Sequence, residues 1–196
     1  METLIRAIEL FALVTGVAYV VLEILQKNAM WVLGIATGAA CAFSFAVQRL
    51  PASMALNLYY VVMSVWGLHQ WRKAARSLSD ADAPASAIHL DRPSRPVLAW
   101  SLALTLGGVA LLFPLLRSLG DAQPLLDAVV TVLSAVGTWW LAKSYPQQWL
   151  IWIVADLLST LLCIRSSMLW MAVLYLVYAA SAVYGYRHWL ARGRYV

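Results

Sequence analysis

A single carboxylate, Asp156, follows two tryptophans within an otherwise apolar run. Trp149, Trp152 and Asp156 are spaced by three and four positions, so on a helix they share one face. A carboxylate is costly to place in hydrocarbon and usually marks a substrate or ion pathway. The spacing therefore predicts that these three residues form a candidate substrate site.

Further polar side chains could complete this site from other apolar runs. Asn57 and Tyr60 lie three positions apart in one run, and Tyr178 lies in the last one. Asn57 is equally well explained as a hydrogen-bonding contact between helices. Glu23 has two explanations of equal weight: a contact with the ligand, or an interfacial ion pair with Lys27 one turn later.

The elements that carry these residues are predicted to be membrane-spanning helices. Of the 196 residues, 63% are hydrophobic and only 12% are charged, which is far from the balance of a soluble globular domain. Seven apolar runs, three of them interrupted by acids, are long enough to cross a hydrocarbon core of about 30 Å. We predict an all-α, polytopic membrane protein with seven transmembrane helices.

The distribution of basic residues predicts how the chain is oriented. Four of the 14 Lys and Arg residues fall on one side of the predicted spans and ten on the other. This asymmetry places the amino terminus outside and the carboxyl terminus in the cytoplasm. The net charge of +5 is therefore interpreted as a topological signal, and we expect no nucleic-acid partner. The first apolar run lacks a clear cleavage site, so no cleavable signal peptide is expected.

Composition divides the chain into four parts. Residues 1–73 contain three predicted helices, and residues 74–96 form a cytoplasmic linker rich in Ser, Asp, Ala, Pro and Arg. His89 lies in this linker and is expected to be a solvated loop residue. Residues 97–117 form a connecting transmembrane helix with few polar groups. Residues 118–196 contain three more helices and a carboxyl-terminal tail.

The two three-helix groups match each other at a constant separation of 118 positions. The matched pairs are Trp31 with Trp149, Ile35 with Ile153, Tyr60 with Tyr178, Gly67 with Gly185, and Trp71 with Trp189. Three helices alone would place the second group upside down in the membrane, and the connecting helix between the groups gives both the same orientation. This predicts a parallel 3+1+3 repeat like that of SWEET-type transporters, with the substrate near the midplane. Asp156 matches Gly38 and Trp152 matches Gly34, so both are additions to a symmetric frame.

These residues resemble the Pnu family of vitamin transporters over nearly the whole chain outside the linker. The resemblance implies facilitated diffusion (uniport) of an unphosphorylated vitamin, metabolic trapping by a cytoplasmic kinase, and a homotrimer in the bacterial inner membrane. The elements that carry it are Trp31, Tyr60, Trp66-Gly67-x-x-x-Trp71, Asp127, Val132-Leu133-Ser134, Lys143, and Gln148-Trp149-Leu150-Ile151-Trp152-Ile153-Val154-Ala155-Asp156.

Three positions point to one branch of that family. In the nicotinamide riboside branch, PnuC, the positions of Asp156 and Gln148 are usually Asn, and Glu23 is generally absent. The resemblance is therefore closer to the PnuT branch, which implies thiamine as the main substrate and nicotinamide riboside as the alternative. Both are small vitamins with a flat cationic ring, on which the indole of Trp152 or Trp149 could stack while Asp156 balances the charge. The expected substrate-binding residues are Asp156, Trp152, Trp149, Asn57, Tyr60, Tyr178, Glu23 and Gln148.

The expected mechanism is uniport, in which the two three-helix halves rock around a substrate site near the midplane. Proton-coupled uptake is a close alternative, because a membrane carboxylate can carry a proton. An enzyme is not expected, since the three histidines form no ligand cluster and no nucleophile has an evident base. No catalytic residue, metal or cofactor is therefore predicted. A receptor that does not transport is the third possibility.

Overall fold

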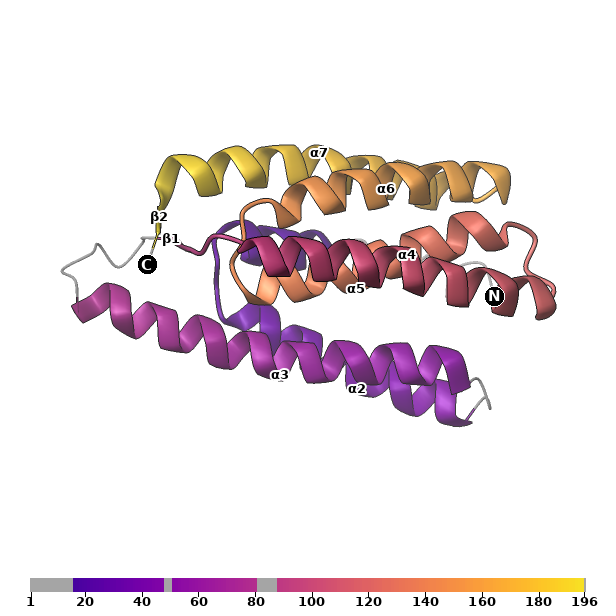
Figure 1. The fold of residues 1–196 in the computed structure, drawn as a ribbon, viewed down its shortest axis with the longest axis horizontal. Coiled ribbons are helices and arrows are strands. Elements are labelled where there is room, and N and C mark those ends of the chain that lie inside the picture. Colours follow the sequence, from indigo (N-terminus) through magenta and orange to yellow (C-terminus); the bar gives the residue numbers. More distant parts are fainter. Residues whose placement is uncertain (1–15, 48–50, 81–87, 196) are drawn as a thin grey trace, which may run out of the picture. The chain divides into compact units, whose positions relative to one another are not determined.

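The protein is built from helices, with one very short pair of strands (Figure 1). The computed structural model describes residues 16–47, 51–80 and 88–195. Within these ranges seven helical segments occur, the first covering residues 16–24. The others are α2 (Ala29–Val47), α3 (Pro51–Asp80), α4 (Arg95–Ser118), α5 (Pro124–Ala142), α6 (Gln148–Arg165) and α7 (Leu169–Arg192). Strands β1 (Ile88–Leu90) and β2 (Gly193–Tyr195) pair with each other.

Four of the described helices, α4 to α7, are long and apolar enough to cross a membrane. The apolar part of α2, Ala29–Phe43, is shorter than these four. Helix α3 extends beyond its apolar part into a charged segment that begins at Arg72. The predicted all-helical membrane architecture is therefore confirmed at the level of the helices, and a small sheet is added to it.

The described residues divide into two compact units. One contains the residues up to His89 together with Arg192–Arg194, and the other contains Leu90–Ala191 together with Tyr195. The division falls within the segment predicted as a linker. That segment is more ordered than its composition suggested, because α3 continues to Asp80 and β1 covers residues 88–90.

The predicted repeat has a local counterpart where the first helix of each unit's three-helix group ends. Gln26 and Ser144, which are 118 positions apart, both adopt left-handed backbone, with φ of 50° and 58°. In both places the next amide donates to the carbonyl five positions back: Lys27 to Leu22 (2.8 Å) and Tyr145 to Trp140 (3.1 Å). This is the Schellman ending, in which a left-handed residue lets the last carbonyls be capped.

Tryptophan pairs repeat in the same way. In the first unit the rings of Trp31 and Trp71 meet edge to face, with centroids 5.1 Å apart and planes at 77°. In the second unit Trp149 and Trp189 meet with centroids 5.5 Å apart and planes at 87°. All four side chains are fully buried. Edge-to-face pairs of this kind add about 0.5–1.5 kcal/mol to the stabilisation from burial.

A glycine lies against one ring of each pair. A Cβ added to Gly67 would lie 2.6 Å from the Trp31 ring, and one added to Gly185 would lie 2.7 Å from the Trp149 ring. No real Cβ approaches a ring this closely, so both positions require glycine. The two glycines therefore let the helices that carry them approach the indole rings directly.

Strand β1 corrects one expectation from the sequence. His89 was expected to be solvated, but only 7% of it is exposed. Its ring meets Trp71 edge to face at 5.9 Å, and its backbone N–H and carbonyl bond the Gln26 side chain at 2.8 and 2.9 Å. The neighbouring Ile88 and Leu90 are also buried. The polar composition of residues 74–96 as a whole therefore concealed a buried strand of three residues. Burial lowers the pKa of His89 to about 4.

Helix α4 packs along α5 in the second unit. The indole N–H of Trp140 donates to the Ser101 hydroxyl across 2.8 Å, and Val132 packs with Val136 and neighbouring apolar side chains of α4. A Cβ added to Gly108 of α4 would lie 2.9 Å from Val132. Helix α4 is thus held by the second unit and forms part of the groove described below.

Candidate functional site

Asp156 lies in the middle of α6 with only 7% of its surface exposed. Trp149 and Asp156 of the predicted stripe are buried, and Ser159 and Cys163, which continue it along the helix, are buried as well. Trp152, the third predicted member, is half-buried. The opposite side of the helix is exposed and apolar, including Leu150, Val154, Leu157 and Leu161. Helix α6 therefore turns its one carboxylate inward and its aliphatic side chains outward, as a membrane helix with a functional acid should.

Two tyrosines of α7 accompany Asp156. Tyr175 and Tyr178 both lie within electrostatic range of its carboxylate. Tyr175 also lies within electrostatic range of Asp127, an acid in the first turn of α5. Helices α5, α6 and α7 thus gather two carboxylates and two phenols in the second unit. Tyr178 was among the predicted residues, whereas Tyr175 was not, although it lies three positions earlier on the same helix.

Trp152 differs from Trp149 in its surroundings. Its indole packs on Gly137 of α5, where an added Cβ would lie 3.3 Å from the ring. The indole N–H of Trp152 is buried and lacks a hydrogen-bond partner among the described residues. The same is true of the indole N–H groups of Trp149 and Trp31. Trp31 and Trp149 are 118 positions apart and make matching edge-to-face contacts in the two units, which favours a packing role for both. Trp152, whose partner position is Gly34, has no such explanation and remains the aromatic candidate for the ligand.

The first unit holds Glu23, Asn57 and Tyr60. Glu23 is buried, and Tyr19 lies within electrostatic range of both Glu23 and Tyr60. Tyr60 also meets Tyr59, with ring centroids 5.6 Å apart. Glu23 and Tyr60 therefore both lie near Tyr19. Tyr19 was not among the expected substrate-binding residues, although it lies four positions before Glu23. Two further predicted residues are Asn57, on α3 beside Gly38, and the buried Gln148, which opens α6.

Large and small residues are exchanged between the two units at matching positions. In the first unit Tyr19 lies over Gly34, where an added Cβ would be 3.9 Å from the tyrosine ring. In the second unit the residue 118 positions after Tyr19 is Gly137, and the residue 118 positions after Gly34 is Trp152. In the first unit the first helix of the contact supplies the aromatic ring and the second supplies the glycine. In the second unit these roles are reversed. This exchange is what gives the second unit its indole near Asp156.

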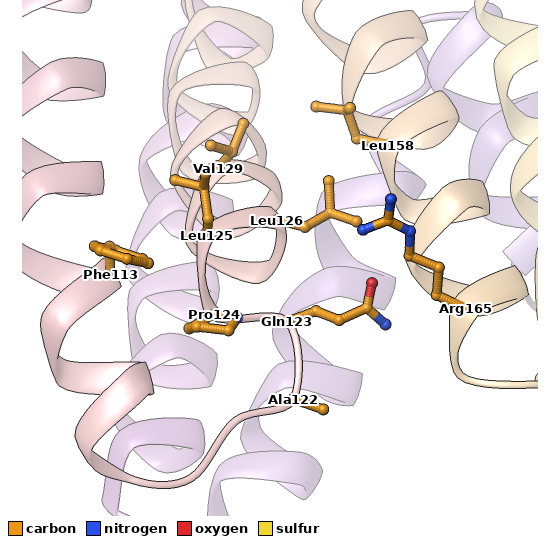
Figure 2. A pocket seen from close by; sticks show the side chains of 9 residues that line it. All are labelled: Phe113, Ala122, Gln123, Pro124, Leu125, Leu126, Val129, Leu158 and Arg165. Atoms are coloured by element: carbon orange, nitrogen blue, oxygen red, sulfur yellow. The ribbon is translucent and has the colours of Figure 1, made fainter.

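A groove of about 450 Å³ opens elsewhere in the second unit (Figure 2). It is lined by residues of α4, the α4–α5 loop, α5 and α6: Phe113, Ala122, Gln123, Pro124, Leu125, Leu126, Val129, Leu158 and Arg165. None of the predicted substrate-binding residues lines it. Along α6, Arg165 lies nine residues beyond Asp156, which is roughly 13 Å at about 1.5 Å per residue. Leu158 also lines the groove and is only two positions beyond Asp156, which on a helix places the two side chains on different sides. The groove and the Asp156 cluster therefore lie on different sides of α6.

Comparison with known proteins decides the family. A sequence model described as nicotinamide mononucleotide transporter matches residues 6–191. The chain belongs to this family. The predicted resemblance to Pnu transporters is thereby confirmed, and the chain is a membrane transport protein and not an enzyme.

Individual relatives agree with this assignment. The chain is 28% identical to the nicotinamide riboside transporter PnuC of Neisseria mucosa over 187 residues, covering 91% of this chain and 70% of that protein. It is 22% identical to PnuC of Escherichia coli, covering 95% and 86%. The riboflavin/roseoflavin transporter RibM of Streptomyces davaonensis is 28% identical over 147 residues, covering 74% and 67%.

A solved structure agrees as well. The crystal structure of the vitamin B3 transporter PnuC superimposes with a TM-score of 0.65 at 27% identity, covering 92% of this chain and 79% of that one. The expectation of thiamine as the main substrate gains no support from any of these relatives. The alternative expectation, a transporter of the PnuC type, is the one they favour.

Proposed function

We propose that this protein carries nicotinamide riboside across the bacterial inner membrane by facilitated diffusion. The observation that supports the proposal is the similarity along nearly the whole chain to proteins named nicotinamide riboside transporters. The family model named for nicotinamide mononucleotide and the fold of a vitamin B3 transporter agree with a substrate of this kind. Nicotinamide riboside replaces thiamine as the preferred substrate, because the thiamine expectation depended on only three sequence positions.

The second unit offers groups that suit this substrate. Its pyridinium ring is a flat cation, and its ribose carries hydroxyl donors. Asp156 can balance the ring charge or accept from the hydroxyls. Trp152 has a buried N–H without a partner among the described residues and a ring face that can stack on a cation. We assign Tyr178 and Tyr175 to polar contacts beside Asp156, and we keep Glu23, Tyr60 and Asn57 as candidates in the first unit.

Transport by reconstituted protein tests the substrate. Liposomes containing the purified full chain should take up labelled nicotinamide riboside faster than labelled thiamine or riboflavin. Protein-free liposomes give the leak rate, and an excess of each unlabelled vitamin gives its competition. Faster uptake of thiamine, or competition by thiamine alone, would overturn the assignment. Riboflavin is included because RibM is among the relatives.

The energy coupling needs its own measurement. A uniporter equilibrates the vitamin but does not accumulate it, whereas proton coupling would drive accumulation when a pH gradient is imposed. We propose uniport, with net uptake in the cell maintained by a cytoplasmic kinase that phosphorylates the vitamin. Accumulation above the outside concentration in liposomes with a pH gradient would contradict uniport.

We also propose that the two three-helix groups are parallel copies of one repeat, with α4 as the connector, in a homotrimer. The matched Schellman endings and the matched Trp–Gly contacts support the repeat. The distribution of Lys and Arg supports an outside amino terminus and a cytoplasmic carboxyl terminus. Cysteine labelling from each side of the membrane tests the orientation, and the mass of the detergent-solubilised protein tests the trimer.

A further inference from the structure

The groove lined by Phe113, Gln123, Leu125 and Arg165 has the composition of a lipid site. Seven of its nine lining residues are apolar, and the two polar ones are Gln123 and Arg165. It lies where α4 and α6 end and α5 begins, and these three helices are candidate membrane spans. The groove therefore opens at one end of the spans, where a bilayer changes from hydrocarbon to headgroups.

Arg165 supplies a positive charge at the rim of this groove. It is the last residue of α6, and Figure 2 shows its guanidinium turned over the groove toward Leu126 and the amide of Gln123. No ion pair or hydrogen bond engages this guanidinium within the part of the chain that the structure describes. A planar guanidinium without an acid partner is well suited to a phosphate, which it can bind through two parallel hydrogen bonds.

Gln123 adds a second polar requirement. Its amide nitrogen donates to the Ser166 hydroxyl at 3.3 Å, which leaves the amide oxygen to find a donor. That oxygen is buried and has no hydrogen-bond partner among the described residues. A buried acceptor without a partner is destabilising, so a ligand that brings a hydroxyl group to this place is favoured.

We propose that this groove binds one anionic phospholipid of the phosphatidylglycerol type. The phosphate pairs with Arg165, a hydroxyl of the glycerol headgroup donates to Gln123, and an acyl chain lies along the apolar wall that includes Leu125 and Phe113. The volume of about 450 Å³ is within the range of sites that hold small ligands, about 300–1,000 Å³. The charge, the acceptor and the apolar wall thus each match one part of the same molecule.

Native mass spectrometry of the delipidated full chain tests the proposal. The protein in detergent is titrated with dioleoyl-phosphatidylglycerol and, separately, with dioleoyl-phosphatidylcholine, which has the same chains but no hydroxyl or N–H donor and no net charge. The wild-type protein should retain phosphatidylglycerol preferentially. Arg165→Gln should weaken that binding about tenfold, the size expected for a charged hydrogen bond, and Arg165→Lys should weaken it less.

Matched variants separate the groove from general surface charge. Arg117→Gln removes an exposed Arg near the end of α4 that does not line the groove, and it should leave lipid binding unchanged. Leu125→Trp fills the apolar part and should reduce phosphatidylglycerol binding while Arg165 is intact, so the test does not depend on one variant folding. Gln123→Leu should reduce the preference for phosphatidylglycerol over phosphatidylcholine.

Several results would overturn the proposal. One is equal binding of the two lipids by the wild-type protein, or equal phosphatidylglycerol binding by the wild type and Arg165→Gln. Another is displacement of the lipid by excess water-soluble glycerol phosphate, which would indicate a site for free phosphate. A third is a shift in oligomer masses in Arg165→Gln with unchanged lipid binding, which would indicate that a second copy of the chain occupies the groove.

Discussion

Replacing Gly185 with alanine should weaken the tryptophan pair of the second unit. An added Cβ would lie 2.7–2.8 Å from three atoms of the Trp149 ring, whereas carbon atoms pack best at about 3.5–4.0 Å. The ring would have to move by about 1 Å, but it is buried against Trp189 at 5.5 Å. Overpacking of this kind costs up to about 3 kcal/mol, and alanine returns about 1 kcal/mol of helix propensity. The expected net loss is about 2 kcal/mol.

Thermal melting of the detergent-solubilised protein, followed by tryptophan fluorescence, measures this loss. A 2 kcal/mol loss corresponds to a decrease in Tm of about 4–8 °C for a chain of this size. Gly67→Ala should produce a similar decrease through Trp31, because the contact is repeated in the first unit. Gly107→Ala is the control, since an added Cβ there meets nothing within 4 Å. A Gly185→Ala protein that melts like the Gly107→Ala protein would refute the packing argument.

Three further predictions concern the site and strand β1. Asp156→Ala should weaken binding of nicotinamide riboside by about tenfold or more in a titration, and Asp156→Asn, which keeps an acceptor, should weaken it less; wild-type affinity in both variants would remove Asp156 from the site. Because the pKa of His89 is lowered to about 4 in the folded protein, the unfolded chain takes up a proton first as the pH falls. Stability should therefore decrease from about pH 6.5 toward pH 4, by about 2 kcal/mol at pH 5, and His89→Asn should remove this part of the pH dependence of Tm. Gln26→Leu leaves the His89 backbone without the two bonds that it makes to Gln26, so its Tm should fall by the equivalent of about 1–3 kcal/mol, and an unchanged Tm would show that those bonds contribute nothing.

Much of the fold could be predicted because it depends on patterns that extend along the sequence. Apolar runs predict spanning helices through their length alone, and the tryptophans and glycines at a constant separation predict repeated contacts. Strand β1 could not be found this way. It is only three residues long, and its burial depends on Gln26 and Trp71, which are far away in the sequence.

The candidate site was predicted in part for the same reason. Helical spacing places Trp149 and Asp156 on one buried face without knowledge of any neighbour. Which residues of other helices approach Asp156 depends on helix packing, so the proximity of Tyr175 to Asp156 could not be predicted from spacing along α6. The proposed lipid groove was not predicted. Gln123 and Arg165 belong to no sequence motif, and they come together only because the ends of three helices lie close to one another.

The choice of substrate shows a different limit. The preference for thiamine depended on the residues at three positions, Asp156, Gln148 and Glu23, which differ from those usual in the PnuC branch. Similarity along almost the whole chain outweighs three positions, because a single polar residue can change without changing the rest of the site. Asp156 remains a proposed binding residue, but its identity alone does not identify the vitamin.

The exchange of Tyr19 and Gly34 for Gly137 and Trp152 shows how two matching helix contacts can come to differ. A helix contact that holds one ring and one glycine keeps nearly the same volume when the two swap sides, so neither backbone has to move. Single substitutions within such a pair would create either a hole or a collision, whereas the two together are tolerated. New ligand surfaces can therefore evolve in a duplicated frame by paired substitutions that a comparison of one position at a time would miss.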